Sequence, residues 1–171
     1  MAKKNAKYPY DYVGFYDTET RQCIDISKKR EDIEKILGKG KENGNDFYTK
    51  YSNNLSIGYD KNENVYCMKL TNASDTISQY ELPGGINLNS TVTEFIDLYP
   101  FIYEESGNQN DVGIFIKETS GKYSVINKNT LRQSLKSISE KENESNLYWI
   151  QLSYSSYSEI DYISIYALNS S

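Results

Sequence analysis

The sequence lacks histidine altogether, has only two cysteines and contains no long apolar run. Without histidine, Ser-His-Asp triads, Cys–His dyads and nearly all catalytic zinc arrangements are excluded. No segment approaches the roughly 18–20 apolar residues that cross a bilayer, and none has the apolar core of a signal peptide. We therefore expect no membrane span, no metal and no cofactor, and we predict that the protein is not an enzyme.

Cys23 and Cys67 each lie in an apolar segment that is typical of a strand. A buried, unreactive thiol is the usual state of such a residue. One disulfide between Cys23 and Cys67 is the alternative, and an oxidising compartment would allow it. The sequence leaves both alternatives open.

Tyrosine is abundant, with 17 residues in 171, whereas alanine and leucine are scarce. Tyrosine and β-branched residues favour strands, so a fold dominated by sheets is expected. The net charge is −5, and the acidic excess lies in residues 51–171, with 15 acidic against 8 basic side chains. Because no stretch combines dense lysine and arginine with aromatic residues, nucleic acid is not an expected partner.

The compartment depends on whether a leader precedes this chain. If Met1 is the natural start, a cytoplasmic protein is expected. If Met1 replaces a leader, the protein is extracellular or held in the cell envelope, with a lipid anchor as one option. A composition rich in tyrosine, serine and asparagine favours export. The sequence predicts no oligomeric state.

A stretch of 15 residues occurs twice and indicates a duplication. Residues 24–38 align without a gap with residues 86–100, and both copies carry apolar residues at the same positions. Each copy predicts a short helix with an apolar stripe. The first helix is expected to run from a cap at Ser27 to Leu37, with Gly38 as its stop.

The second helix has two possible starts and one clear end. The alignment places its cap at Asn89, whereas Thr91 and Glu94 form a capping box that competes with it. Pro100 cannot continue a helix and therefore ends this one.

The chain divides into two α+β repeats at Pro83-Gly84-Gly85. Residues 1–9 are interpreted as a flexible arm, 10–82 as the first repeat, and 83–171 as the second, with a helical insertion near 127–146. Each repeat is expected to lay a short helix on an antiparallel meander of three or four strands. A sheet that small is marginal alone, but two copies side by side share one core. The hairpin expected over residues 55–70 aligns with the one over 112–126.

The first repeat also resembles a known family. Residues 26–38, which run from Ile-Ser to Ile-Leu-Gly, are followed by Leu-Ser-Ile-Gly-Tyr-Asp over residues 55–60. This order resembles the repeat of β-lactamase-inhibitor-protein-like and SmpA/OmlA-like domains, which Gram-positive bacteria carry in tandem in small exported or lipid-anchored proteins. The resemblance implies a non-enzymatic protein that presents the face of a paired sheet to a target.

Two patterns in the sequence suggest chemistry, but neither meets the requirements of that chemistry. Asp60, Asn62 and Asn64 copy the first three ligands of a calcium loop, but Val65 stands where that loop needs glycine. We therefore interpret the segment as a hairpin turn. Carboxylates are plentiful, but no spacing selects a catalytic pair, so a hydrolase is the last hypothesis.

Aromatic residues gather in the hairpin expected over residues 147–168. Alternation places Ile163 and Ile165 on one face of its second strand and tyrosines on the other. Tyrosine and tryptophan are enriched at recognition surfaces. The alternative is that these rings only cover a two-sided sheet. The candidate binding residues are Trp149, Tyr162, Tyr166, Tyr154 and Tyr157.

Taken together, the residues predict an inhibitor or adaptor that binds another protein through the face of a duplicated sheet. A cell-envelope protein that binds a glycan through its aromatic surface is one alternative. A cytosolic inhibitor of a host enzyme, carried by a phage or mobile element, is another.

Overall fold

The structure is a computed structural model of the chain, and it describes residues 5–42, 44, 47–52, 54–71, 79–105, 110–139 and 145–168. Three helices are interspersed among the strands of the described residues. In chain order the elements are β1 (Asn5–Lys7), β2 (Gly14–Asp17), β3 (Gln22–Asp25), α1 (Arg30–Leu37), β4 (Lys41–Glu42), β5 (Tyr48–Lys50), β6 (Leu55–Tyr59), β7 (Val65–Thr71), β8 (Tyr80–Glu81), α2 (Val92–Leu98), β9 (Tyr103–Glu105), β10 (Asn110–Thr119), β11 (Lys122–Ile126), α3 (Lys128–Ser139), β12 (Asn146–Ser156) and β13 (Glu159–Ala167).

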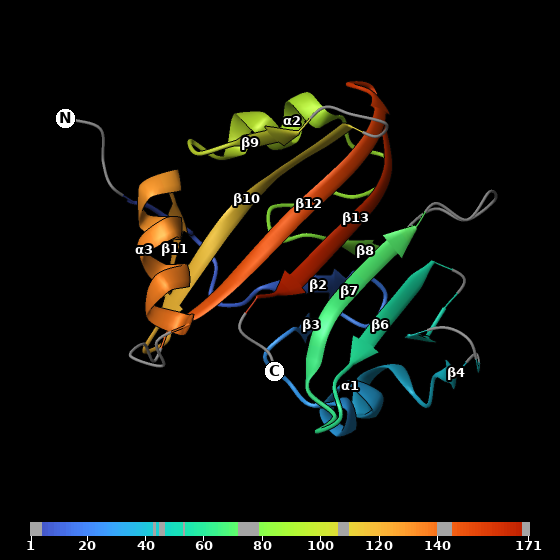
Figure 1. Cartoon of the computed structure of the whole chain (residues 1–171). Coiled ribbons are helices and arrows are strands. Elements are labelled where there is room, and N and C mark those ends of the chain that lie inside the picture. Colours follow the sequence, from blue (N-terminus) through green and yellow to red (C-terminus); the bar gives the residue numbers. More distant parts are fainter. Residues whose placement is uncertain are drawn as a thin grey trace.

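Ten of these strands form one large antiparallel sheet, which spans the molecule (Figure 1). Its order is β1-β11-β10-β12-β13-β7-β6-β5-β4, and β9 pairs with β10 beside β11. The pairing of β13 with β7 joins the C-terminal part of the chain to the N-terminal part. The predicted α+β class with antiparallel sheets is confirmed.

The long strands form because apolar and polar residues alternate along them. In β13, Ile163 and Ile165 are fully buried, whereas Tyr162 and Tyr166 on the opposite face are partly exposed. In β12, Ile150 and Leu152 are buried in the same way. The large sheet therefore has one apolar face, called the inner face below, and one mixed face, called the outer face.

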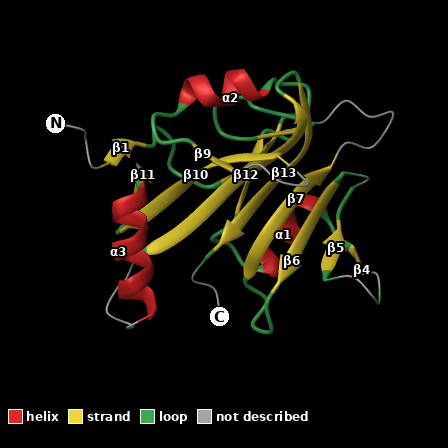
Figure 2. Cartoon of the chain, turned by 45° about the horizontal axis from the view of Figure 1, so that its top comes forward, coloured by secondary structure: helices red, strands yellow, loops and turns green. Residues whose placement is uncertain are grey.

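A second layer covers the inner face. It contains the three-stranded sheet β3-β2-β8 together with α1 and α2 (Figure 2). Phe15 on β2, Ile33 on α1 and Phe95 on α2 are fully buried in one hydrophobic cluster with the inner face. The third helix, α3, lies at one end of the outer face, where Leu131 packs on Ile126 and Leu147.

Helix α1 begins three residues later than the sequence predicts. Ser27 does not cap it, because the Ser27 backbone N–H donates to the Asp25 carboxylate at 2.9 Å and belongs to a turn. The first helical residue is Arg30, whose guanidinium lies 3.1 Å from Glu34 and 2.8 Å from Glu42. Gly38, with φ at 78°, ends the helix as predicted.

Helix α2 begins with the capping box and not at Asn89. The Thr91 hydroxyl accepts from the Glu94 backbone N–H at 3.2 Å, and the Glu94 carboxylate accepts from the Thr91 N–H at 2.8 Å. Asn89 instead donates its backbone N–H to the Asn87 side chain. The helix ends at Leu98, two residues before Pro100.

Residues 5–9 of the predicted flexible arm are part of the fold, and residues 1–4 lie outside the described residues. Asn5–Lys7 forms strand β1, which pairs with β11 at one edge of the large sheet. The next residue, Tyr8, is only 2% exposed, and its ring lies 5.2 Å from Tyr10 and 6.4 Å from Tyr99. Burial of this ring and pairing of the backbone hold the segment in place.

The two predicted repeat ranges, 10–82 and 83–171, share one core. Strand β7 of the first range pairs with β13 of the second, and buried residues of both ranges lie in a single cluster. The two hairpins that align in sequence do not occupy matching places in the sheet: β6–β7 borders β13, whereas β10–β11 lies beyond β12. The predicted helical insertion contains β12's first residue and α3.

The cap of α2 yields the first testable prediction. Replacing Thr91 by alanine removes one half of the capping box and should lower the free energy of unfolding by about 1 kcal/mol. The matched control is Asn89→Ala, which should change it by only a few tenths of a kcal/mol, because the Asn89 side chain does not cap the helix. Urea denaturation measures both. A larger loss for Asn89→Ala than for Thr91→Ala would contradict this assignment.

Candidate binding face of the large sheet

The register of the large sheet brings four residues into one row on the outer face. Phe115 lies directly opposite Trp149, Trp149 opposite Tyr166, and Tyr166 opposite Cys67. Directly opposite residues in antiparallel strands project from the same face and contact each other. The residues that precede them in β10 and β13, Ile114 and Ile165, are fully buried on the inner face. The row therefore crosses β10, β12, β13 and β7.

Trp149 is the centre of a first aromatic cluster. Its indole centroid lies 4.3 Å from that of Phe115 and 6.2 Å from that of Tyr103 on β9. The indole N–H donates to the Gln151 side chain at 2.8 Å, which fixes the orientation of the ring. Gly113 makes this arrangement possible, because a Cβ there would lie 2.5 Å from the indole Cη2 atom. We call Trp149, Phe115 and Tyr103 the Trp149 cluster.

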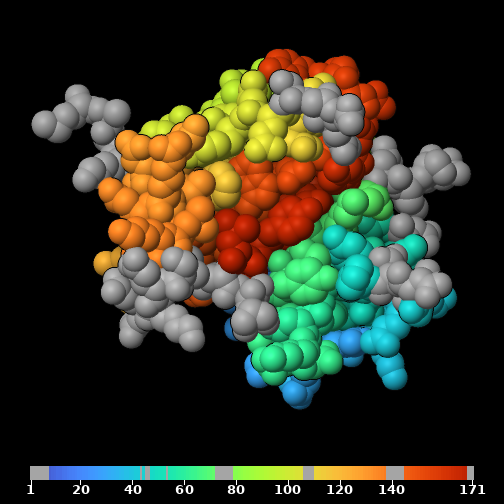
Figure 3. Space-filling model, in the orientation of Figure 1, coloured from blue at the N-terminus to red at the C-terminus, as the bar shows by residue number. Residues whose placement is uncertain are grey.

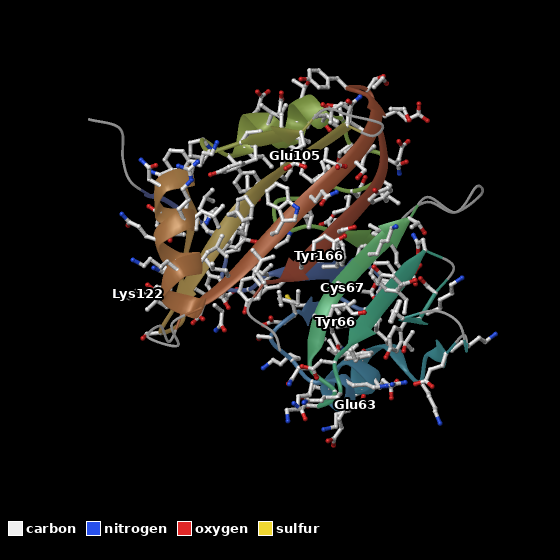
Figure 4. The ribbon with its side chains drawn as sticks, in the orientation of Figure 1. Glu63, Tyr66, Cys67, Glu105, Lys122 and Tyr166 are labelled. Carbon is white, nitrogen blue, oxygen red and sulfur yellow. The ribbon has the colours of Figure 1, made fainter. Side chains whose placement is uncertain are left out.

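A second cluster surrounds Cys67. Tyr166 lies opposite Cys67, and the Tyr66 ring covers Gly58, where a Cβ would lie 2.7 Å from both the Cys67 sulfur and the Tyr66 ring. Burial raises the pKa of the Cys67 thiol, although hydrogen bonds with Tyr48, Gly58 and Tyr66 act in the opposite direction. Figure 4 shows Tyr66, Cys67 and Tyr166 together on β7 and β13. We call Tyr48, Tyr66 and Tyr166 the Tyr166 cluster.

A polar row lies beside the aromatic row. Gln151 is directly opposite Ser164, and Ser164 is directly opposite Lys69. The Lys69 ammonium lies 4.2 Å from the centroid of the Tyr162 ring, a cation–π contact. The outer face thus carries two aromatic clusters with a partly exposed amide, that of Gln151, and a partly exposed cation, Lys69, beside them.

The structure places three of the five predicted binding residues on this face. Trp149 and Tyr166 face each other across β12 and β13, and Tyr162 lies two pairs further along the same face, beyond Ser164. Tyr154 and Tyr157 lie elsewhere, at the β12–β13 turn, with their rings 5.4 Å apart. Tyr157 is 50% exposed and donates its hydroxyl hydrogen to Glu104. A bulge after Ser153 shifts the register and separates this turn from the face.

Four further residues of the face were not predicted from the sequence. They are Phe115, Tyr103, Tyr66 and Lys69. They come from three other strands, and a single sequence does not reveal which strands become neighbours. Phe115 has one local signal: Val112, Ile114 and Ile116 alternate inward, so an aromatic residue at 115 projects to the outer face. The other three residues carry no such signal.

The two cysteines are free, so the alternative of a disulfide is not realised. Cys23 is exposed on β3 of the small sheet, where it lies opposite Tyr16. Cys67 is buried on the outer face of the large sheet, which faces away from the small sheet. Because the two side chains belong to different layers, the geometry for a bond between their sulfurs is absent.

The segment that resembles a calcium loop, Asp60 to Asn64, is a hairpin turn. The Asp60 carboxylate accepts from the backbone N–H groups of Asn62 and Asn64, at 2.8 and 3.0 Å, so it closes a hairpin turn. Within the part of the chain that the structure describes, no cluster of three or more acidic or cysteine side chains could hold a metal ion. None of the described helices has the length and apolar character needed to cross a membrane.

Comparison of the chain with protein-family models, with curated proteins and with solved structures finds no match.

Thiol accessibility tests the placement of the cysteines. A thiol reagent such as DTNB should modify Cys23 rapidly in the folded protein, and Cys67 only on unfolding, because burial both shields its thiol and disfavours the reactive thiolate. The variant Cys23→Ser should show no rapid phase. Rapid modification of both thiols, or of neither until a reductant is added, would contradict this structure.

The single tryptophan gives a direct probe of the Trp149 cluster. Gly113→Ala places a methyl group against the indole and the Ile150 carbonyl, so Trp149 emission should shift to the red and the protein should lose about 1–3 kcal/mol of stability. Gly44→Ala is the control, since a Cβ there meets no atom within 4 Å. Unchanged emission in Gly113→Ala would be incompatible with the described packing.

Proposed function

We propose that this chain is a non-enzymatic protein-binding domain of the inhibitor or adaptor type, and that it binds its partner through the outer face of the large sheet. The observation that carries the proposal is the row formed by Phe115, Trp149 and Tyr166. These rings are partly exposed on a rigid antiparallel sheet, with Lys69 and Tyr162 beside them.

The shape of this region supports the proposal. In Figure 3, atoms of β12 and β13 form the surface between α3 on one side and β7 on the other. Apart from α3, which packs on Leu147 at the start of β12, no described helix or strand lies over them in this view. Tryptophan and tyrosine contribute most to binding energy at protein interfaces, because they offer a large contact area at a small entropic cost.

We further propose that the large sheet is built from two copies of a duplicated α+β unit. Counted outward from the central pair of β7 and β13, the strands are β6, β5 and β4 on one side and β12, β10 and β9 on the other. Helix α1 precedes β4 in the chain, and α2 precedes β9. This order supports two equivalent α+β units, with β11 and α3 inserted in the second. In this order, β6–β7 of the first unit corresponds to β12–β13 of the second. The sequence alignment instead matched the hairpin over residues 55–70 with the one over 112–126.

The resemblance of residues 26–38 and 55–60 to β-lactamase-inhibitor-protein-like and SmpA/OmlA-like repeats supports the same mode of action. That resemblance implies presentation of a paired sheet to a target protein. It specifies no target.

Affinity capture tests the proposal. The wild-type chain should retain a protein from extracts of its source cell, and the purified partner should bind Trp149→Ala/Tyr166→Ala at least about tenfold more weakly, because buried aromatic anchors contribute about 2 kcal/mol or more. Tyr157→Ala is the matched control: it removes an exposed tyrosine that lies off the face and should bind as the wild type does. Circular dichroism checks that each variant is folded.

Two outcomes would refute the proposal. One is recovery of no stable protein partner, and the other is a partner that binds the double variant as tightly as the wild type. Binding of soluble glycans that is lost in the double variant would favour the glycan-binding alternative instead.

A further inference from the structure

A pair of like charges lies at the opposite edge of the large sheet from α3. Lys41 on β4 is directly opposite Lys50 on β5. Side chains in this relation have Cβ atoms about 4.5–5.5 Å apart, and like charges there destabilise the pair. A third lysine, Lys39, lines the same pocket of about 320 Å³, together with Tyr51 and Ser52. Three exposed lysines therefore line one pocket, and two of them are directly opposite each other.

Among the described residues, no carboxylate forms a salt bridge with this cluster. The salt bridges that the described residues form involve Arg30 and Lys35 and none of the three pocket lysines. Glu42, which follows Lys41, is paired with Arg30 at 2.8 Å. An overall excess of lysine does not account for the cluster either, because the chain has a net charge of −5.

The backbone under the lysines is held independently of their charges. The Glu34 carboxylate accepts hydrogen bonds from the Gly40 backbone and from the Tyr51 hydroxyl, the latter at 3.0 Å. The Tyr51 hydroxyl is also 2.7 Å from the Tyr59 hydroxyl. Burial alone would raise the pKa of Glu34, but hydrogen bonds with Arg30 and Tyr51 lower it overall. The carboxylate therefore stays ionised and keeps its hydrogen bonds.

Gly40 brings the two edge strands together. A Cβ at this position would lie 2.8 Å from the Tyr51 ring and would collide with the Thr49 methyl group. Only glycine allows β4 to approach β5 so closely, and this approach places Lys41 over Lys50. The pocket is thus preorganised by contacts that do not involve its lysine side chains.

We propose that the pocket of Lys39, Lys41 and Lys50 binds a phosphate-type oxyanion, either free or carried on a small molecule. A compact anion with two negative charges accepts hydrogen bonds from all three ammonium groups and removes their mutual repulsion. Lysine, as a mobile point charge with three donors, suits such a ligand. This site lies at the β4–β5 edge of the outer face, where the row of Lys69 continues through Ser56 to Lys50 and Lys41, away from the aromatic row. The proposal stands whether or not the aromatic row binds a protein.

Calorimetric titration with inorganic phosphate tests the site. Titrations run against chloride of equal ionic strength, so that general screening is the same in both. Wild type should bind phosphate, and Lys41→Gln/Lys50→Gln should bind it at least about tenfold more weakly, because two charged hydrogen bonds are lost. The matched control, Lys122→Gln/Lys128→Gln, removes the same charge from exposed positions outside the pocket and should bind as wild type does.

Phosphoserine serves as a second probe to identify the source of the anion. Tighter binding of phosphoserine than of inorganic phosphate assigns the pocket to phosphate groups on small molecules. Binding of inorganic phosphate alone assigns it to the free anion.

Charge reversal makes the test independent of folding defects. Lys50→Glu places a carboxylate opposite Lys41, so its melting temperature in chloride should exceed that of wild type, and phosphate should not raise it further. Phosphate should raise the melting temperature of the wild type. The proposal is overturned if phosphate has no effect on wild type beyond that of chloride, or if it acts equally on wild type and Lys50→Glu.

Discussion

The pairing of β7 with β13 is the interaction on which the rest of the structure depends. It joins two segments almost a hundred residues apart, and it places Leu70 opposite Ile163 and Met68 opposite Ile165 on the inner face. Without this pairing the large sheet would divide into a group of four strands and a group of six, and neither would carry the whole apolar face. Together they form one continuous apolar face, on which Phe15, Ile33 and Phe95 of the second layer are buried. The core and the outer face therefore both depend on this one pairing.

The same pairing decides what the outer face contains. Because side chains alternate, a shift of one residue in this register would exchange the two faces of β13 and expose its isoleucines. Burial of Ile163 and Ile165 thus also sets the position of Tyr166 against Cys67 and of Tyr162 beside Lys69. The glycines at 58 and 113 leave room for aromatic rings to lie flat against the strands. The composition of the outer face is thus a consequence of how the core is buried.

Electrostatics distinguishes two parts of the N-terminal half. Arg30 lies at the start of α1 among Glu34, Glu42 and Glu63, and it contacts the Tyr59 ring, so its charge has a structural role. The three pocket lysines at the nearby sheet edge have no such partners among the described residues. A basic residue in the first turn of a helix and like charges opposite each other both break local rules. Salt bridges compensate the charge of Arg30, whereas we propose that a bound anion compensates the charges of the pocket lysines.

The sequence by itself determined the local features of this protein. Alternation predicts β6, β7, β10, β11, β12 and β13 and sorts their inward residues, while Gly38 and Pro100 predict where two helices end. These features depend on residues close together in the chain. Only the tertiary structure decided that β1 joins the sheet, that α1 begins at Arg30, that Phe115 contacts Trp149 and that Lys41 meets Lys50. Each of these depends on which distant strands become neighbours, and that choice follows from the apolar area that the whole arrangement buries, which no local pattern encodes.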